Sequence, residues 1–223
     1  AIGGRGQWQN LHSRVADMMV IRYDASNSML KSDKISSQTN FFLAPANHLE
    51  LTIENLKQSI YCLHDDCNWY YSEKINYLQF FGPEPIHFDQ TYPRVNALEV
   101  LDLKMINKVV IEENMYRIDF KDGRQKDGIQ SLYFDRESYL VMKRSSLSNN
   151  DVRWTFVYEN YQQKEGYTEP YLIKLMANDD IYMTYQVEDI DYNFKLNPAL
   201  FDPPKPCKNE PGYEILDAPH YLM

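Results

Sequence analysis

The six residues from Leu49 to Glu54 alternate strictly between an aliphatic and a polar side chain, in the order Leu, Glu, Leu, Thr, Ile, Glu. Successive side chains of a β-strand point to opposite faces of the sheet, so this run predicts a strand with one buried and one solvated face. Strands of this kind are typical of antiparallel sheets, since parallel sheets are usually covered on both faces. The run therefore predicts an antiparallel sheet with one apolar face.

Two turn candidates, residues 55–58 and 63–66, extend this strand into a meander of three strands. Alternation then assigns each side chain of the meander to an apolar or a polar face. The predicted cross-strand pairs are Ile53 with Ile60, Leu51 with Cys62, and Cys62 with Cys67. The predicted apolar face holds Leu51, Ile53, Ile60, Cys62, Cys67, Trp69 and Tyr71, and the polar face holds Glu50, Thr52, Glu54, Ser59, Asn68 and Ser72.

Short strand signals recur along most of the chain, with turn signals such as residues 121–123 and 135–138 between them. In all they predict about ten or eleven strands and little helix, which favours one curved sheet in a sandwich-like or barrel-like β-fold. The apolar face of such a sheet needs a cover, because exposing it costs roughly 25 cal/mol per Å². The expected covers are a short N-terminal helix near Trp8 and Leu11 and the segment 73–108.

The segment 73–108 interrupts the strand pattern. Its Gly82-Pro83-Glu84-Pro85 and Tyr92-Pro93 sequences oppose a regular central strand, because proline cannot donate to a sheet ladder. Residues 95–104 are compatible with a short helix or with another strand, and we interpret the segment as an insertion or lid with one helix. Residues 1–205 are then expected to form a single domain, followed by a polar C-terminal tail at 206–223.

Composition and charge exclude several classes of protein. The 223 residues include 18 Tyr, 10 Phe and 3 Trp but only 8 Gly, which favours strands and opposes glycine-rich phosphate loops. The net charge of −9 opposes a surface that neutralises nucleic-acid phosphates, so we expect no nucleic-acid partner. No apolar run approaches the roughly 20 residues of a membrane-spanning helix, so we expect no transmembrane segment.

Catalytic motifs are not evident. The five histidines are scattered and form no metal-ligand spacing, and the sequence has no GxSxG, GxxxxGK[ST] or GxGxxG pattern. Adjacent carboxylates such as Asp179-Asp180 fall at expected turns, where solvated loop residues are the favoured interpretation over a glycosidase pair or a cation site. We therefore expect a protein that is not an enzyme, with no catalytic residue, metal or cofactor.

The cysteines leave two interpretations open. Cys62 and Cys67 flank a four-residue turn, and opposed hairpin positions can be bridged with small adjustment, so a disulfide and two free thiols are both compatible with the sequence. A metal site that includes His64 and Asp65 is disfavoured, because the spacing lacks CxxC and a second ligand pair. Cys207 has no partner nearby in the sequence and is expected to be unpaired.

Several short motifs resemble the periplasmic outer-membrane lipoprotein carrier (LolA-like) superfamily. That superfamily typically shows a strand with F-x-x-x-P, a turn leading to a tryptophan, a Y-x-x-Y-x-x-x-x-G-x-x-x-P run and a closing F-x-P-P. The corresponding residues here are Phe41 and Pro45, then Asn68 and Trp69, then Tyr158, Tyr161, Gly166 and Pro170, and finally Phe201, Pro203 and Pro204.

The resemblance implies an unclosed antiparallel half-barrel of the α+β, mainly β class, with helices covering its concave face. It also implies a protein of the periplasm or cell envelope, exported with a signal sequence absent from this chain, in an oxidising compartment that permits a Cys62–Cys67 disulfide. The expected function is non-catalytic binding of a lipid or lipoprotein acyl chain in an apolar cavity. Lipoprotein transport or sorting is the role that the resemblance suggests for such binding. The alternative is a structural or sensory envelope module that binds a protein partner and fills its cavity with its own side chains. The expected cavity residues are Leu51, Ile53, Ile60, Trp69, Tyr71, Trp154, Phe156 and Tyr158.

Overall fold

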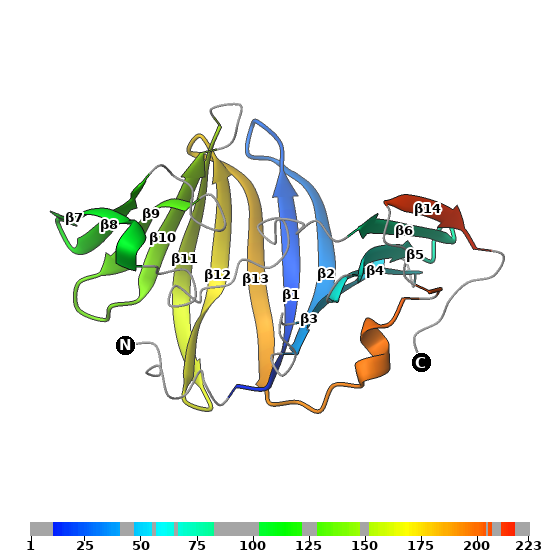
Figure 1. The fold of residues 1–223 in the computed structure, drawn as a ribbon. Coiled ribbons are helices and arrows are strands. Elements are labelled where there is room, and N and C mark those ends of the chain that lie inside the picture. The colour runs from blue at the N-terminus through cyan, green and yellow to red at the C-terminus, as the bar shows by residue number, and fades with distance from the viewer. Residues whose placement is uncertain are drawn as a thin grey trace. The chain divides into compact units, whose positions relative to one another are not determined.

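The structure is a computed structural model that describes residues 11–40, 47–54, 57–64, 67–82, 103–121, 129–147, 152–203, 205–206 and 211–216. These residues form fourteen strands, labelled along the chain in Figure 1. The strands are β1 (Ser13–Tyr23), β2 (Met29–Asn40), β3 (Asn47–Glu54), β4 (Lys57–His64), β5 (Cys67–Ser72), β6 (Tyr77–Gly82), β7 (Ile106–Glu112), β8 (Met115–Phe120), β9 (Ile129–Asp135), β10 (Val141–Leu147), β11 (Arg153–Lys164), β12 (Tyr167–Ala177), β13 (Asp180–Tyr192) and β14 (Gly212–Ile215).

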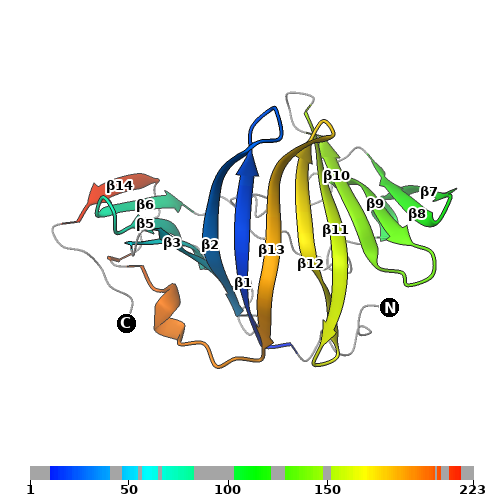
Figure 2. The same ribbon diagram turned by 180° about the vertical axis from the view of Figure 1, so that it is seen from behind.

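The strands follow one hydrogen-bonding order, β14-β6-β5-β4-β3-β2-β1-β13-β12-β11-β10-β9-β8-β7, which can also be followed from behind in Figure 2. The order is linear, so among the described strands β14 and β7 are its two edges and the sheet does not close into a barrel. The mainly β, antiparallel, unclosed sheet predicted from the sequence is confirmed. The predicted number of ten or eleven strands is too low, and β6 and β14 are among the strands that lie where none was expected.

The predicted helices over the apolar face are not supported. Within the described ranges the helical elements of the structure are two short 3-10 helices, η2 (Leu103–Met105) and η4 (Pro198–Phe201). The expected N-terminal helix near Trp8, and most of the expected helix at 95–104, lie outside the described residues. None of the helices in the described part has the length and hydropathy needed to cross a bilayer.

The chain divides into two compact units. Unit 1 comprises residues 1–9, 20–32 and 88–187, and unit 2 comprises residues 10–19, 33–87 and 188–223. Within unit 2, β6 occupies part of the expected lid and pairs with β5, and β14 pairs with β6. Part of the expected C-terminal tail is therefore a strand at the edge of the sheet.

The hairpins of unit 2 are tighter than predicted. Glu54 pairs with Lys57, and His64 pairs with Cys67, so each turn spans two residues rather than four. As a result Leu51 lies opposite Ile60 instead of Cys62, and the predicted pairs are wrong by two positions. A shift of two residues keeps every side chain on its predicted face, whereas a shift of one would reverse the faces.

The sheet of unit 1 has one apolar and one polar face. Its polar face carries ion pairs between neighbouring strands: Lys174 on β12 contacts Glu159 on β11 at 2.7 Å. On β8, Arg117 contacts Asp119 at 3.0 Å and also pairs with Glu112 of β7. The apolar face follows from the register of the same strands. It includes the buried residues Leu132, Phe156, Tyr158, Ile173, Leu175, Met183 and Tyr185.

The first strand, β1, lies between β2 and β13 in the sheet order. In unit 2 the backbone N–H of His12 donates to Asn193 Oδ1 at 2.9 Å, and the N–H of Asn193 donates to the carbonyl of Ser13 at 2.8 Å. In unit 1 the hydroxyls of Tyr23 and Thr184 lie 3.3 Å apart. Both contacts join residues more than 160 positions apart, so β1 is held against the much later strand β13 in the interior of the sheet order.

Candidate functional site

The apolar face of unit 2 forms a compact core on three neighbouring strands. Ile60 and Cys62 of β4, and Trp69 and Tyr71 of β5, are all fully buried, as the sequence predicted for this face. The cluster also contains residues that the sequence did not single out. They are Leu78 and Phe80 of β6, Phe201 of η4, and Leu216 after β14, with Leu196 packed against them.

The segment around η4 covers this face. Asn197 caps η4, and its side chain accepts a hydrogen bond from the backbone N–H of Ala199 at 3.1 Å. The carbonyl of Phe201 accepts a hydrogen bond from Trp69 Nε1 at 3.2 Å and a weaker one from Cys62 Sγ at 3.5 Å. The bond from Trp69 satisfies an indole N–H that would otherwise be buried without a partner. In unit 2, the chain therefore covers its own apolar face.

Two motifs that the sequence presented as separate meet at this point. Trp69 follows the predicted turn of the first meander, and Phe201 opens the Phe-Asp-Pro-Pro motif near the C-terminus. The structure joins them through the hydrogen bond from Trp69 to the Phe201 carbonyl. Phe201 could have been suspected as a core residue from its motif, but nothing local indicates which strand it contacts.

Cys62 is a free cysteine, which decides against the disulfide with Cys67, one of the two interpretations that the sequence left open. The register places Trp69, rather than Cys67, opposite Cys62, and pairs Cys67 with His64. Burial in the apolar cluster raises the pKa of the Cys62 thiol well above its ordinary value, and the negative charge of Asp202 raises it further. Since the thiolate is the reactive form, Cys62 acts as a small apolar core residue.

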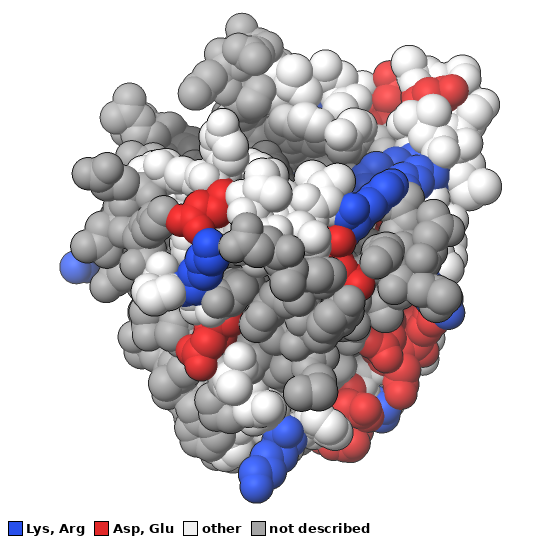
Figure 3. Space-filling view, turned by 90° about the vertical axis from the view of Figure 1, so that its right-hand side faces the viewer, with Lys and Arg blue, Asp and Glu red and all other residues white. Residues whose placement is uncertain are grey.

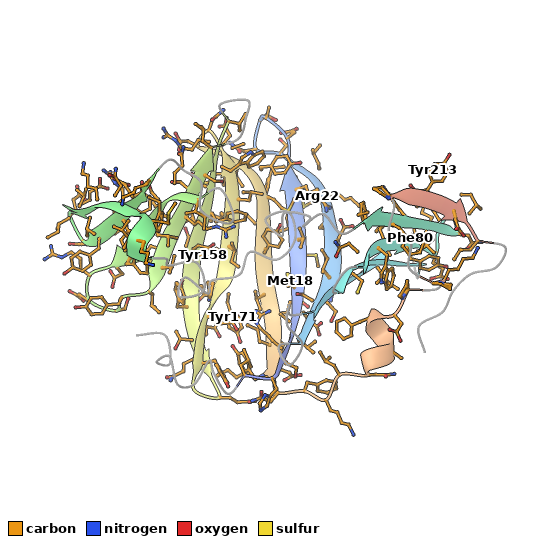
Figure 4. All side chains as sticks on the ribbon, in the orientation of Figure 1. Met18, Arg22, Phe80, Tyr158, Tyr171 and Tyr213 are labelled. Carbon is orange, nitrogen blue, oxygen red and sulfur yellow. The ribbon has the colours of Figure 1, made fainter. Side chains whose placement is uncertain are left out.

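The apolar face of unit 1 carries the other predicted row, Trp154, Phe156 and Tyr158 on β11. Phe156 and Tyr158 are 3% and 1% exposed, and their rings stack with centroids 6.5 Å apart. The guanidinium of Arg144 on β10 lies over the Phe156 ring, 4.6 Å from its centroid. In the register of β11 with β12, Phe156 lies opposite Leu175 and Tyr158 lies opposite Ile173. Tyr158 is labelled in Figure 4.

Exposure increases toward the Trp154 end of this row. Trp154 is only partly buried, and its ring meets that of Tyr182 edge to face at a centroid distance of 5.4 Å. Tyr182 is itself exposed and lies at a register irregularity of the β12–β13 pair. The row therefore runs from a solvent-accessible aromatic pair to a fully buried stacked pair.

The eight predicted cavity residues fall into separate groups. Ile60, Trp69 and Tyr71 come together in the cluster of unit 2, and Trp154, Phe156 and Tyr158 form the row in unit 1. Leu51 and Ile53 lie on β3, but their side chains are outside what the structure describes.

Charged side chains are dispersed in the described part of the chain. The structure brings no three His, Cys, Asp or Glu residues of the described ranges into a group that could hold a metal ion. Acidic and basic side chains lie near one another on the face shown in Figure 3. His12, the one histidine whose exposure is described, is exposed, and the side chains of His48, His64, His87 and His220 are outside the described set.

An unclosed antiparallel sheet with an apolar face in each unit defines the class of fold, and solved structures of other proteins share it. No family model and no curated protein sequence matches the chain. A putative outer membrane lipoprotein-sorting protein domain from Vibrio parahaemolyticus is 11% identical with a TM-score of 0.58, covering 86% of this chain and 89% of that one. A DUF1329 family protein from Desulfovibrio piger is 8% identical with a TM-score of 0.62, and the match covers 88% of this chain and 92% of that one.

The third is a LolA superfamily protein from Nitrosomonas europaea, which is 10% identical with a TM-score of 0.57 and covers 87% of this chain and 91% of that one. The resemblance to the LolA-like superfamily expected from the short motifs is thus confirmed at the level of the fold. At 8–11% identity the likeness concerns the fold alone.

Proposed function

We propose that this protein is a non-catalytic protein of the periplasm or cell envelope that binds a lipid or lipoprotein acyl chain on the apolar face of unit 1. The observation that carries the proposal is the aromatic row of β11, which is partly exposed at Trp154 and fully buried at Tyr158. A flexible acyl chain fits such a row, since it needs apolar contact along its length and no specific hydrogen bonds. The fold shared with a lipoprotein-sorting domain supports this choice of ligand.

Unit 1 is favoured over unit 2 because its aromatic row has an accessible end, whereas the cluster of unit 2 consists of buried residues. In unit 2 Phe201 and Leu216 fill the space above Trp69 and Tyr71, so a ligand there would have to displace the chain's own core. In unit 1 the aromatic pair Trp154 and Tyr182 offers an accessible end. Each buried CH₂ group of an acyl chain contributes up to about 0.8 kcal/mol, so about ten methylene groups against this row would contribute up to about 8 kcal/mol before the entropic cost of association.

Quenching of tryptophan fluorescence by a brominated fatty acid tests this site. Bromine quenches an indole only near contact, and the chain has tryptophans at positions 8, 69 and 154. In a Trp8→Phe background we expect saturable quenching by 9,10-dibromostearic acid that disappears when Trp154→Phe is added. Trp69 provides the internal control, because it is fully buried in unit 2 and should keep its emission.

Two results would refute the acyl-chain site. One is the absence of saturable quenching in the Trp8→Phe protein. The other is quenching of the same amplitude after Trp154→Phe, which would place the bromine near Trp69 instead. Circular dichroism of each variant establishes that the sheet is intact before the titration.

The self-filled core of unit 2 favours a second function, that of a structural or sensory envelope module that binds a protein partner. The two functions differ in what the purified protein retains. A lipid carrier expressed in a bacterial envelope is expected to show bound fatty acid or phospholipid in native mass spectrometry, and to release it on denaturation. A protein-binding module is expected to release none.

A further inference from the structure

The strand β7 forms an edge of the sheet in unit 1, with β8 as its neighbour in the order of the described strands. Val109 and Ile111 of β7 are 58% and 62% exposed. The register pairs Val109 with Ile118 of β8, and Ile118 in turn with Leu132 of β9, which is buried. The apolar face of unit 1 thus continues to an exposed edge, which is a recognised site of association between sheets.

Among the described strands, the outer backbone of β7 has no neighbour and is available for pairing. Glu112 and Met115 close the two-residue turn between β7 and β8, so they form a hydrogen-bonded pair. Because such pairs alternate along an antiparallel ladder, the N–H and C=O groups of Val109 and Ile111 point away from β8. The two exposed apolar residues are therefore the ones whose backbone groups face outward.

We propose that β7 pairs antiparallel with β7 of a second copy of this chain, about a two-fold axis at Val110. The sequence from Lys108 to Glu112, Lys-Val-Val-Ile-Glu, is complementary to itself in this arrangement. Val109 lies opposite Ile111 of the second copy on the apolar face, and Lys108 lies opposite Glu112 of the second copy on the polar face. Opposite charges and aliphatic pairs directly across a ladder are both stabilising.

The neighbouring registers lack this complementarity. An axis at Val109 would place Lys108 opposite Val110, and an axis at Ile111 would place Val110 opposite Glu112. Registers centred on a residue are the relevant ones, because a two-fold axis perpendicular to the sheet keeps each side chain on its own face. The axis at Val110 is therefore selected by both charge and hydrophobicity.

The other edge strand, β14, does not offer the same pairing. Tyr213 and Ile215 are exposed there, but the register that places them opposite each other also places Glu214 opposite its own copy. Like charges directly across a ladder are destabilising. Glu214 already contacts Lys205 at 2.7 Å within the chain. We therefore assign the second copy to β7 and not to β14.

A single pair of edge strands buries a small area, below the roughly 1,200 Å² of standard stable interfaces. The dimer is therefore expected to dissociate on dilution and to form at high protein concentration. Sedimentation equilibrium from about 10 µM to 1 mM measures this range, where Kd values in the micromolar to millimolar range fall.

Charge reversal at the two ends of the pairing gives a decisive test. Lys108→Glu places glutamates opposite Glu112 of the second copy, and Glu112→Lys places lysines opposite Lys108. Each variant alone is expected to self-associate about tenfold more weakly than the unmodified protein. An equimolar mixture is expected to recover association as a mixed dimer, because each glutamate at one position then faces a lysine at the other. Lys121→Glu, which changes the net charge as Lys108→Glu does but lies outside β7, should leave association unchanged.

Three results would overturn the proposal: a monomer throughout the concentration range, undiminished self-association of both variants, or a mixture that does not recover. Glu112 also pairs with Arg117, so Glu112→Lys is checked for folding by circular dichroism. A measurement on the unmodified protein is independent of that check. The amides of Val109 and Ile111 should exchange more slowly with deuterium at 1 mM than at 10 µM, and unchanged exchange there would contradict pairing through β7.

Discussion

Asp135 organises the turn between β9 and β10 through one carboxylate oxygen. This oxygen accepts hydrogen bonds from the backbone N–H and the hydroxyl of Ser138, both at 2.7 Å, and from the N–H of Glu137 at 3.2 Å. The backbone and side-chain bonds from Ser138 lower the pKa of Asp135 below its ordinary value. The sequence predicted this turn at 135–138. Asp24 fixes the turn between β1 and β2 in the same way, because its carboxylate accepts hydrogen bonds from the backbone N–H groups of Ser26 and Ser28.

We expect Asp135→Ala to destabilise the protein at neutral pH and to have little effect in acid. A carboxylate with a lowered pKa in the folded state stabilises the fold above its unfolded pKa, and this contribution is lost as the pH falls through the folded pKa. Urea unfolding at pH 7 and at successive values below pH 4 measures the difference between variant and unmodified protein. Glu137→Ala, in the same turn, is the control. Its difference in unfolding free energy from the unmodified protein should not become smaller as the pH falls. A gap of constant size at all pH values would contradict the role of the ionised carboxylate.

At the scale of elements, the segment around η4 stabilises unit 2 although it contributes no strand there. Its Phe201 is fully buried against β4, β5 and β6, and its carbonyl holds the indole of Trp69. We expect Phe201→Ala to cost about 3–5 kcal/mol of unfolding free energy, because it leaves a cavity in a packed cluster. Phe194→Ala in the same connection is the matched control, since Phe194 is 56% exposed, and it should cost less than about 0.5 kcal/mol.

Chemical denaturation followed by circular dichroism measures both phenylalanine variants. Equal losses of stability would mean that η4 covers the sheet without stabilising it. A loss confined to Phe201→Ala would establish that the segment is part of the core.

The sequence predicts faces better than it predicts partners. Ile60, Cys62, Trp69 and Tyr71 were assigned to one buried face correctly despite a register wrong by two, because side-chain direction depends only on parity. Phe201 could not be assigned to that face, since its contact with Cys62 spans 139 residues. Local periodicity carries no information over that distance.

Strand limits were misread for identifiable reasons. β6 ends at Gly82, directly before Pro83, so the prolines mark the end of a strand and not its absence. β2, with the sequence MLKSDKISSQTN, lacks apolar alternation, yet it lies in the interior of the sheet order. There the hydrogen bonds to both neighbours favour a strand that propensity alone would not predict.

At the scale of the whole molecule, the sheet combines very local and very distant pairings. β11 and β12 are joined by the turn Glu165–Gly166, with both residues at positive φ as two-residue hairpins require. β1, in contrast, lies beside β13, which follows it in the sequence by more than 150 residues. Distant pairings must first pay the entropy of closing a long loop, so we expect β1 to join the sheet after the β11–β12 hairpin has formed.

Two variants of unit 1 test this order by stopped-flow refolding and unfolding in urea. Val20→Ala on β1 should mainly accelerate unfolding, with a φ-value of about 0–0.3, whereas Ile173→Val on β12 should also slow refolding. Both side chains are fully buried, so each substitution changes stability by about 1 kcal/mol or more, enough for a φ-value. A higher φ-value at Val20 than at Ile173 would reverse the proposed order.

The pairing of β1 with β13 has a consequence for biosynthesis. His12 and Asn193, which hydrogen-bond in the finished sheet, are 181 residues apart. At ribosomal rates of about 5–20 residues per second, the first strand waits roughly ten to forty seconds before its partner has been synthesised. During that interval the edge of β1 that later pairs with β13 is open, so a chaperone that shields β1 would protect the nascent chain from aggregation.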